Sequence, residues 1–525
     1  MAVKRIFELI PKNIAHTQRG YGILLVGLIF ISAILPYLPG LNNGFIYDDK
    51  FLIPRNPVVR GERAVKEIFT RDFNRYFGGK SAYYRPVVDL SYWLEFRLWR
   101  ENPAGYHLTN MIVHSIVSVL LFLVVRRWAK EQKIALISGL IFALHPAHTQ
   151  SVCWISGRTD LFCMLFLLCA YYFYTRAREK EEKLELKWLI LSLLSFALAL
   201  FSKEIAVISP VLFFLLELKR GKNLKGIFSQ QSLAFYSGWV FLILIYFLIR
   251  LQVLGFLFGY PERAFYEWYY QNQLDVSRIA TVFKVYFYYL QTLFFPIHLC
   301  FESRMLVSNS WLSASLIARI CAILFLLGAG LVSLKRFSEF GICILWFFIS
   351  LLPVVNILPY RELIMEHLVY LPSIGFCLAL ALIFNQVMEN AHRRKKLLAQ
   401  AMLSLILLGY GALTISRQGV WKDELVFWRD AAFKAPLKRR PWYNYGIRVK
   451  EKGDVRAAFR AWKLAVKAEP DDSDVHNNLG AIYYEMGDID SAIFEFEEAL
   501  RFNPNHQRAR LNLEKLIRLR NRGIP

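Results

Sequence analysis

The stretch YGILLVGLIFISAILPYL, residues 21–38, decides the fold class of this chain. It carries no charged residue over a length close to the roughly 20 apolar residues that cross a bilayer as a helix. Similar runs recur along the 525-residue chain, which is 56% hydrophobic and 20% charged. Because helices satisfy their own backbone polar groups in lipid, the sequence predicts a polytopic helical membrane protein.

Basic residues gather in short clusters between the apolar runs, which is the distribution typical of cytoplasmic turns. This explains the net charge of +23 without a nucleic-acid partner, since no nucleic-acid-binding motif accompanies it. With a cytoplasmic N-terminus, the pattern predicts about eleven crossings and places the loop 40–105 and the C-terminal tail outside. Segment 278–296 is then expected to lie at the interface without crossing.

A charged tail with an internal repeat follows the last apolar run. Asn444-Tyr445-Gly446 and Asn478-Leu479-Gly480 lie 34 residues apart, which is the period of the tetratricopeptide repeat. The predicted fold is therefore all-α, with a membrane part over residues 1–418 and a tetratricopeptide α-solenoid over residues 419–525. Such a stack presents a groove for a polypeptide, although repeats that only brace the membrane part are an alternative.

Two adjacent carboxylates stand on the polar loop that follows the first apolar run, in Phe45-Ile46-Tyr47-Asp48-Asp49. A carboxylate at a membrane exit can act as a general base for an acceptor hydroxyl. The pair can also hold a divalent cation against a phosphate. The plain alternative is a helix N-cap, in which the carboxylate accepts backbone N–H bonds.

Further polar motifs recur at the ends of the runs that share this predicted outer side. Ionisable groups at the edge of a membrane segment are costly, so each is a candidate functional residue. These motifs are Tyr84-Arg85-Pro86, Tyr106-His107, His145-Pro146-Ala147-His148-Thr149, Arg158-Thr159-Asp160, Ser202-Lys203-Glu204 and Glu366-His367.

Some of these residues have plainer roles open to them. Opposite charges within Lys203-Glu204 and within Arg158-Thr159-Asp160 can satisfy each other as ion pairs. His145 and His148 have a spacing that suits two metal ligands, but we expect them to be hydrogen-bonding residues beside a proline-ended helix.

In this order along the chain, the loop aspartates, the polar motifs and the C-terminal repeats resemble the TMTC family of transmembrane O-mannosyltransferases. The resemblance covers about residues 40–515. It implies a GT-C-class enzyme that moves a sugar, with mannose favoured, from a polyprenyl-phosphate donor to a protein or glycan hydroxyl with inversion. Gln150 and His367 depart from the pattern, since an acidic residue and an arginine are expected there, and the repeat array is short.

The resemblance and the chemistry together suggest roles for the motif residues. Asp48 or Asp49 is the expected catalytic base. The expected ligands of the donor phosphate are Arg85, Arg158, Lys203 and His367, because guanidinium and ammonium groups suit phosphate. The expected supporting residues are His107, His145, His148, Asp160, Glu204 and Glu366. A divalent cation, Mg²⁺ or Mn²⁺, is compatible if Asp48, Asp49 and Glu366 converge, but side-chain cations can do the same work.

Two other classes of function stay open. A non-catalytic scaffold would use the membrane part only to anchor the repeats for an envelope or secretory complex. A transporter of lipid-linked sugars would need no base at Asp48, and the inverted repeats of many transporters are not visible in the sequence. The short loops favour the plasma membrane of a prokaryote, with the endoplasmic reticulum membrane as the alternative.

Overall fold

The computed structural model describes residues 18–73, 83–178, 185–220, 229–257, 276–302, 313–335, 338–355, 357 and 364–521. All regular elements within these ranges are helices, which confirms the predicted all-α class. The chain divides into two compact units. The larger unit comprises Met1–Leu299 and Leu306–Gly419, and the smaller one comprises Cys300–Met305 and Val420–Pro525.

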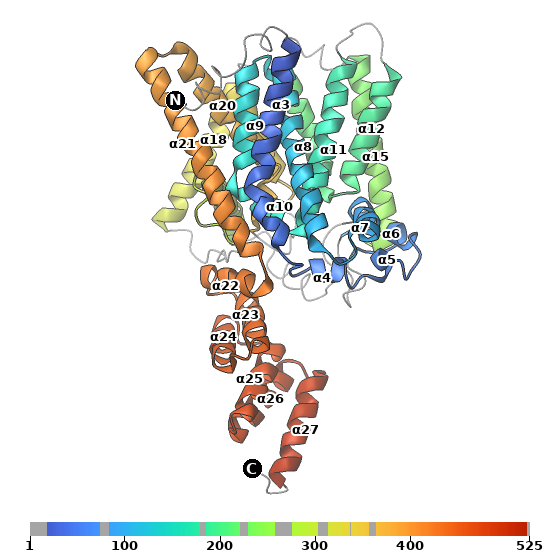
Figure 1. Ribbon diagram of the computed structural model, residues 1–525, viewed down its shortest axis with the longest axis vertical. Helices are drawn as coiled ribbons and strands as arrows, with labels where there is room; N and C mark the ends of the chain where they lie inside the picture. The colour runs from blue at the N-terminus through green and yellow to red at the C-terminus, as the bar shows by residue number, and fades with distance from the viewer. Residues whose placement is uncertain are drawn as a thin grey trace. The chain divides into compact units, whose positions relative to one another are not determined.

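The larger unit is a bundle whose long helices run side by side (Figure 1). Its longer elements are α3 (Gln18–Ile34), α8 (Pro103–Ala129), α9 (Gln132–Leu144), α11 (Arg158–Ala177), α12 (Leu186–Leu200), α13 (Ser209–Arg220), α15 (Gln230–Leu254), α17 (Val276–Phe294), α18 (Ala314–Leu334), α19 (Glu339–Leu351), α20 (Ser373–Asn390) and α21 (Arg393–Gln418).

Within the described ranges, six helices are long and apolar enough to cross a membrane. They are Gly22–Asn42, Pro103–Ala129, Gln230–Leu254, Ala314–Leu334, Ser373–Asn390 and Arg393–Trp421. A seventh results if the pair Pro146–Cys153 and Ile155–Ala177, bent by 104°, counts as one span. Three shorter apolar helices, α9, α12 and α19, accompany them. The multi-pass architecture is therefore confirmed, while the number of about eleven crossings stays a prediction.

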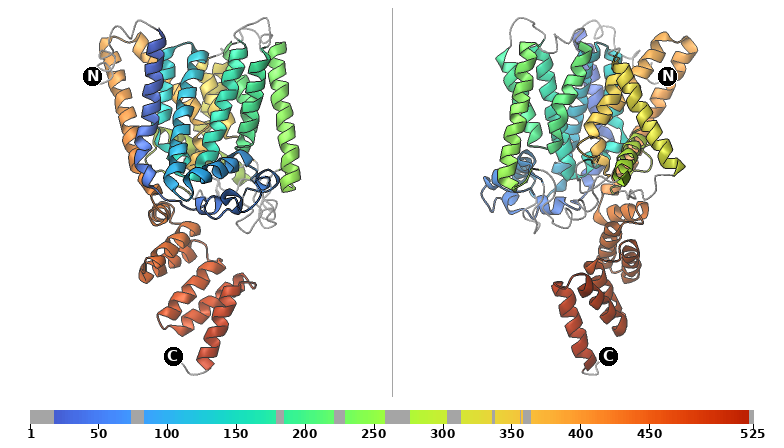
Figure 2. Two further views of the ribbon diagram at one scale, coloured as in Figure 1. Left: turned by 45° about the vertical axis from the view of Figure 1, so that its right-hand side comes forward. Right: turned by 180° about the vertical axis from the view of Figure 1, so that it is seen from behind.

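One end of the bundle carries the short elements. In the loop after the first span these are η1 (Leu35–Asn42), α4 (Asp49–Leu52), α5 (Pro57–Arg60), α6 (Glu67–Thr70) and α7 (Pro86–Trp99). They form a layer across that end of the bundle in each view (Figures 1 and 2). Leu52, Val59 and Tyr92 of the layer are buried in an apolar cluster that also contains Tyr106 and Ile155 of the bundle. The loop is thus packed onto the bundle, which can hold its side chains in fixed positions.

Short elements also interrupt or join the long helices at several points. They are η3 (Pro146–His148), α10 (Thr149–Cys153), η4 (Ile155–Gly157), η5 (Glu204–Ile208) and η6 (Glu366–Val369). Prolines begin several helices, because the ring lacks an N–H that the first turn would leave unpaired anyway. Pro86, Pro103 and Pro146 all stand in such first positions.

The short turn η7 (Gly419–Trp421, whose first residue belongs to the larger unit) leads into the smaller unit. That unit contains paired helices of similar length: α22 (Glu424–Lys434), α23 (Arg439–Glu451), α24 (Val455–Ala468), α25 (Ser473–Glu485), α26 (Ile489–Phe502) and α27 (Gln507–Asn521). Four of the five helices from α22 to α26 begin at an aspartate whose side chain accepts a backbone N–H bond, and α23 is the exception. These aspartates are Asp423, Asp454, Asp472 and Asp488. The turns within the pairs use Gly453 and Gly487 at positive φ, again 34 residues apart.

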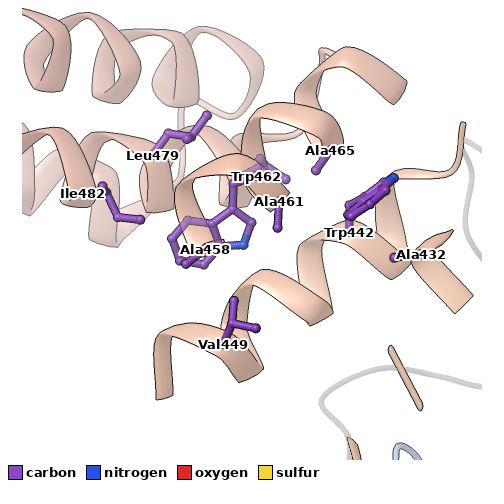
Figure 3. Packing of buried hydrophobic residues seen from close by; sticks show 10 residues of the cluster. Ala432, Trp442, Val449, Ala458, Ala461, Trp462, Ala465, Leu479 and Ile482 are labelled. Carbon is purple, nitrogen blue, oxygen red and sulfur yellow. The ribbon is translucent and has the colours of Figure 1, made fainter. Parts of the chain in front are cut away.

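In the core of the repeat unit, large side chains pack against small residues. Trp462 and Leu479 lie among Ala458, Ala461 and their neighbours in one buried cluster (Figure 3). A Cβ on Gly446 would lie 2.3 Å from the Trp462 indole nitrogen. The glycine at this repeat position is therefore required by close helix packing.

The segment Cys300–Glu302 belongs to the repeat unit, although it lies more than a hundred residues before the tail. Phe301 is buried among the rings of Trp421, Phe427 and Trp428. Glu302 accepts hydrogen bonds from Lys438 and Arg440. No feature of the sequence indicated this addition, since both residues are ordinary members of a loop.

Gly446→Ala is expected to destabilise the repeat unit by about 1–3 kcal/mol, because the added methyl group overpacks the Trp462 contact. Limited proteolysis of the full chain measures this as faster cleavage within residues 420–521. Gly419→Ala is the control, since its Cβ would meet nothing within 4 Å. Equal cleavage rates for the two variants would contradict the packing argument.

Candidate active site

The site is built around the break between α9 and α11, which leaves backbone carbonyls without helical partners. The Asn110 amide of α8 donates to the carbonyl oxygens of Val152, Trp154 and Ile155 at 3.2–3.3 Å. Gly157 makes the close turn possible, because a Cβ there would lie 2.7 Å from two carbonyl oxygens. These contacts hold the break between the two helices in a defined conformation.

Asp49 ties the loop layer to this break. Its Oδ1 atom accepts hydrogen bonds from the Ser156 N–H at 2.9 Å and the Ser156 hydroxyl at 2.5 Å. Its Oδ2 atom accepts from the Ile46 N–H at 3.3 Å. Asp49 is fully buried, and burial raises the pKa of its carboxyl to about 7 against the lowering effect of these bonds. Both oxygens are therefore engaged in holding the loop.

Asp48 stands next to this anchor and is half-buried. The preceding Tyr47 has φ of 48°, a left-handed conformation that is strained for a bulky side chain. The Tyr47 ring lies 6.3 Å from the Trp154 ring, which lies 6.1 Å from the His367 ring, measured between centroids. Asp48 thus follows a strained residue whose ring is linked through Trp154 to His367.

Two of the predicted phosphate ligands, Arg85 and Lys203, are each paired with an acidic side chain. Arg85 forms a two-point bond with Glu204, at 3.1 Å and 2.7 Å. Lys203 donates to Asp160 Oδ1 at 2.6 Å, and both side chains are at most 8% exposed. The alternative of ion pairs within each motif does not describe the structure. Lys203 pairs with Asp160, while Glu204 pairs with Arg85 and Arg158 pairs with Glu95.

Arg158 has a different position from the other cations. It is fully buried, and its guanidinium donates to Asn110, Glu95 and the Tyr106 carbonyl oxygen. A further bond reaches Ser91. The geometry makes Arg158 a residue that positions α7, α8 and α11, because its donors already have protein acceptors.

The histidines also differ in role, since some make structural hydrogen bonds and one lies near the cations. His145 bonds to the Leu293 carbonyl oxygen and accepts from the Ala147 N–H, while His148 bonds to the Phe142 carbonyl oxygen and to Ser373. These are the structural hydrogen bonds that we expected of them. His107 is buried in α8. Of the four, only His367 is close enough to Lys203 and Arg85 to be affected by their charges. Burial, and then these two charges, lower the pKa of the His367 imidazole well below its usual value.

Glu366 has a partner that sequence reasoning missed. Its Oε1 atom accepts from Arg417 at 3.1 Å, and both side chains are buried. One residue further, the Gln418 carbonyl oxygen accepts from the Asn43 amide at 3.5 Å. The C-terminal end of α21 therefore lies at the same end of the bundle as the Asp48 loop.

Several buried polar atoms around the cation cluster have no hydrogen-bond partner among the described residues. They are Asp160 Oδ2, His367 Nδ1, Gln150 Nε2 and Ser151 Oγ. The side-chain oxygen of Gln150 accepts a hydrogen bond from the His367 backbone N–H at 2.9 Å, so the segments that carry these two residues contact each other. Buried polar groups are nearly always bonded, so these atoms are suited to a polar ligand.

The aspartates and Glu366 do not converge on a metal position. Asp49 is bonded to Ser156, and Glu366 to Arg417. Across the ranges that the structure covers, no group of three or more His, Cys, Asp or Glu side chains is arranged to hold a metal ion.

Comparison with known proteins bears on this arrangement. A family model described as dolichyl-phosphate-mannose-protein mannosyltransferase matches residues 84–252, and a tetratricopeptide-repeat model matches residues 473–506. The Caenorhabditis elegans protein O-mannosyl-transferase F38B6.6 is 26% identical over 88% of this chain. Mouse TMTC3 is 25% identical over 92% of the chain, and human TMTC4 is 27% identical over 83%. The resemblance to the TMTC family is confirmed.

This TMTC-like chain spans 64% of the length of the worm relative, 56% of mouse TMTC3 and 65% of human TMTC4. The mannosyltransferase match begins one residue before Arg85 and includes Arg158, Lys203 and Glu204. It leaves out the loop aspartates and His367. The match thus covers most of the cation cluster but not the two aspartates of the loop.

Asp49 should make stability depend on pH. Its folded-state pKa of about 7 lies above the ordinary value of about 4, so its contribution is full below about pH 4 and is lost as pH rises towards 7. Asp49→Asn keeps an acceptor for Ser156 but does not titrate. We expect the melting temperature of the wild type to fall relative to this variant between pH 5 and pH 8. Parallel curves would contradict the assigned pKa.

Proposed function

We propose that this protein is a membrane glycosyltransferase that moves a sugar, mannose in the favoured case, from a polyprenyl-phosphate donor to a hydroxyl of a protein or glycan. The observation that carries the proposal is the Asp48 loop next to a buried cation cluster at one end of the bundle. The similarity to proteins named as protein O-mannosyl-transferases supports the same reaction.

Asp48 is the proposed catalytic base, and Asp49 is its positioning residue. Both oxygens of Asp49 are bonded inside the protein, whereas Asp48 is half-buried and reaches solvent. A base must come within hydrogen-bond reach of the acceptor hydroxyl, and accessibility favours Asp48. The structure thus supports a choice between two carboxylates that the sequence left open.

Arg85 and Lys203 are the proposed cations for the departing phosphate, with His367 beside them. Arg158 is left out of this group, because four of its five N–H donors already have acceptors within the protein. A guanidinium can share its fork between Glu204 and a phosphate oxygen, and Lys203 provides a point charge. Asp160 Oδ2 and Gln150 Nε2, which have no hydrogen-bond partner among the described residues, are the proposed contacts for sugar hydroxyls.

The reaction balances as a single displacement. The acceptor oxygen forms a bond to the anomeric carbon as the bond from that carbon to the phosphate oxygen breaks, and the configuration inverts. The hydroxyl proton passes to Asp48, and the bonding electrons leave with the phosphate beside Arg85 and Lys203. An oxocarbenium-like transition state is stabilised by such fixed charges.

The proposed acceptor reaches the site through the repeat unit, whose groove suits a polypeptide. The proposed site faces the extracytoplasmic side, in the plasma membrane of a prokaryote or, with equivalent topology, in the endoplasmic reticulum membrane. The bilayer itself supplies the donor lipid. A nucleic acid has no place in this function.

Asp48→Asn is expected to lower sugar transfer at least about 100-fold, the size of a typical general-base contribution, while the protein still folds. The assay uses purified full-length protein in detergent with radiolabelled polyprenyl-phosphate sugars and a lysate of acceptors. Asp49→Asn, which keeps the Ser156 bonds, is expected to retain measurable transfer. Loss in Asp49→Asn alone would reverse the two roles.

A scaffold is the second candidate, favoured by the departures at Gln150 and His367. It predicts that Asp48→Asn leaves the cellular function intact, while deletion of residues 419–525 destroys it. Catalysis predicts that the Asp48→Asn variant fails even with the repeats present. Complementation of a deletion strain with each variant separates the two functions.

A further inference from the structure

One arginine interrupts the apolar sequence of a long candidate span. α15 contains 25 residues, and Arg250 is its single charged member. Only 6% of this residue is exposed, so its side chain is enclosed by protein atoms. A charged group within a membrane segment is costly and is a candidate functional residue by default. Arg250 therefore requires an explanation that the apolar residues of α15 do not provide.

Two hydrogen bonds orient the Arg250 guanidinium. Its Nε–H group donates to the Leu257 carbonyl oxygen at 3.0 Å, and Nη1 donates to the Tyr246 hydroxyl at 3.3 Å. Both acceptors are neutral groups. These two bonds therefore fix the direction of the side chain without cancelling its positive charge.

Ring contacts connect α15 to the segments that carry the other cations. The Tyr246 ring lies 5.6 Å from the Phe201 ring, and the Phe201 ring lies 6.0 Å from the Tyr84 ring, measured between centroids. Phe201 is two residues before Lys203, and Tyr84 is next to Arg85. The packing of these three rings therefore brings α15 to the Arg85 and Lys203 segments.

Arg250 acts on the same carboxylate as Arg85. Burial would raise the pKa of Glu204, but the charge and hydrogen bonds of Arg85, followed by the charges of Arg250 and Lys203, lower it to about 2. Glu204 is therefore ionised at neutral pH and lies within the range of three basic side chains. A carboxylate that is shared by two guanidinium groups compensates the charge of each less than a carboxylate held by one.

The proposed reaction creates negative charge at this position. A polyprenyl-phosphate sugar is a phosphodiester with one negative charge, whereas the departing polyprenyl phosphate is a monoester that carries up to about two at neutral pH. The second charge develops on the phosphate as its bond to the anomeric carbon breaks, while the hydroxyl proton passes to Asp48. Fixed cations lower the energy of a transition state in which such charge develops.

We propose that Arg250 is the third cation of the donor-phosphate site and stabilises the second negative charge that forms on the departing phosphate. Its role in the reaction rests on the proposed function, whereas its contribution to the binding of a lipid phosphate does not. Arg85 and Lys203 hold the phosphate of the donor, and Arg250 adds the charge that favours the product state of that phosphate.

The first experiment measures binding without transfer. Purified full-length protein in detergent is titrated at pH 8 with farnesyl phosphate, which carries about two negative charges there, and with farnesyl methyl phosphate, which carries one. Arg250→Gln is expected to weaken the binding of farnesyl phosphate by at least about tenfold, the loss of one charge-assisted contact. For the methyl ester we expect about threefold, because the interaction energy is proportional to the charge of the ligand. Equal affinity of the wild type and Arg250→Gln for farnesyl phosphate would overturn the proposal.

Two further variants separate the charge of Arg250 from its structural bonds. Arg250→Lys keeps a positive charge with a different set of donors and is expected to regain most of the affinity for farnesyl phosphate. Arg319→Gln is the matched control, since Arg319 is the single charged residue of α18 and its guanidinium lies 5.6 Å from the Phe287 ring. This control is expected to bind both ligands as the wild type does. Equal weakening of both ligands in Arg250→Gln, without recovery in Arg250→Lys, would show a structural role and overturn the assignment.

The transfer assay distinguishes failure of this proposal from failure of the proposed function. Arg250→Gln is expected to lower kcat more than it raises KM, because the second charge appears only as the bond breaks. An unchanged kcat in Arg250→Gln, beside lost transfer in Asp48→Asn, would refute the role of Arg250 alone. Absence of transfer from every donor, with binding of farnesyl phosphate still dependent on Arg250, would refute the glycosyltransferase and keep Arg250 as a ligand of a lipid phosphate.

Discussion

The hydrogen bonds that close the break between residues 146 and 158 hold the candidate site in place. In a low-dielectric interior an unpaired carbonyl or charge is costly, so a helix can break there only if side chains replace the lost bonds. Asn110 does this for three carbonyl oxygens, and Asp49 does it for the Ser156 N–H. The same bonds that permit the break therefore bring the loop layer onto it, which is why Asp48 lies where it does.

The same constraint separates structural cations from those that can meet a ligand. Arg158 is as charged as Arg85 and stands in as suggestive a motif, but it is enclosed by Glu95, Asn110 and a carbonyl oxygen. Lys203 has a single carboxylate partner, whose second oxygen is itself without a donor among the described residues. A phosphate can join that arrangement by adding contacts, whereas at Arg158 it would have to displace them.

Much of the fold followed from the sequence, because apolar runs and a period of 34 residues are properties of neighbouring positions. The gathering of the polar motifs at one end also followed from where the runs stop. The partners in ion pairs and hydrogen bonds could not be predicted in this way, because they depend on how the helices pack. Nothing local to Glu366 indicates Arg417, and nothing local to Glu302 indicates Arg440. The carbonyl partners of Asn110 were missed for the same reason.

Packing also decided between residues that the sequence treated alike. Asp48 and Asp49 are adjacent and chemically identical, so no pattern can assign the base to one of them. Once the loop turns at Tyr47, only one of the two side chains can lie against Ser156, and that carboxylate becomes the anchor.

The end of α21 adds a further step to this argument. Arg417 and Gln418 bond to Glu366 and Asn43, which adjoin His367 and the Asp48 loop in sequence. The chain therefore leaves the bundle for the repeats at the end that carries the candidate site. Under the proposed function, a polypeptide bound by the repeats would be held to that end through the covalent connection between the repeats and α21. Its effective concentration at Asp48 would then rise without any dedicated contact.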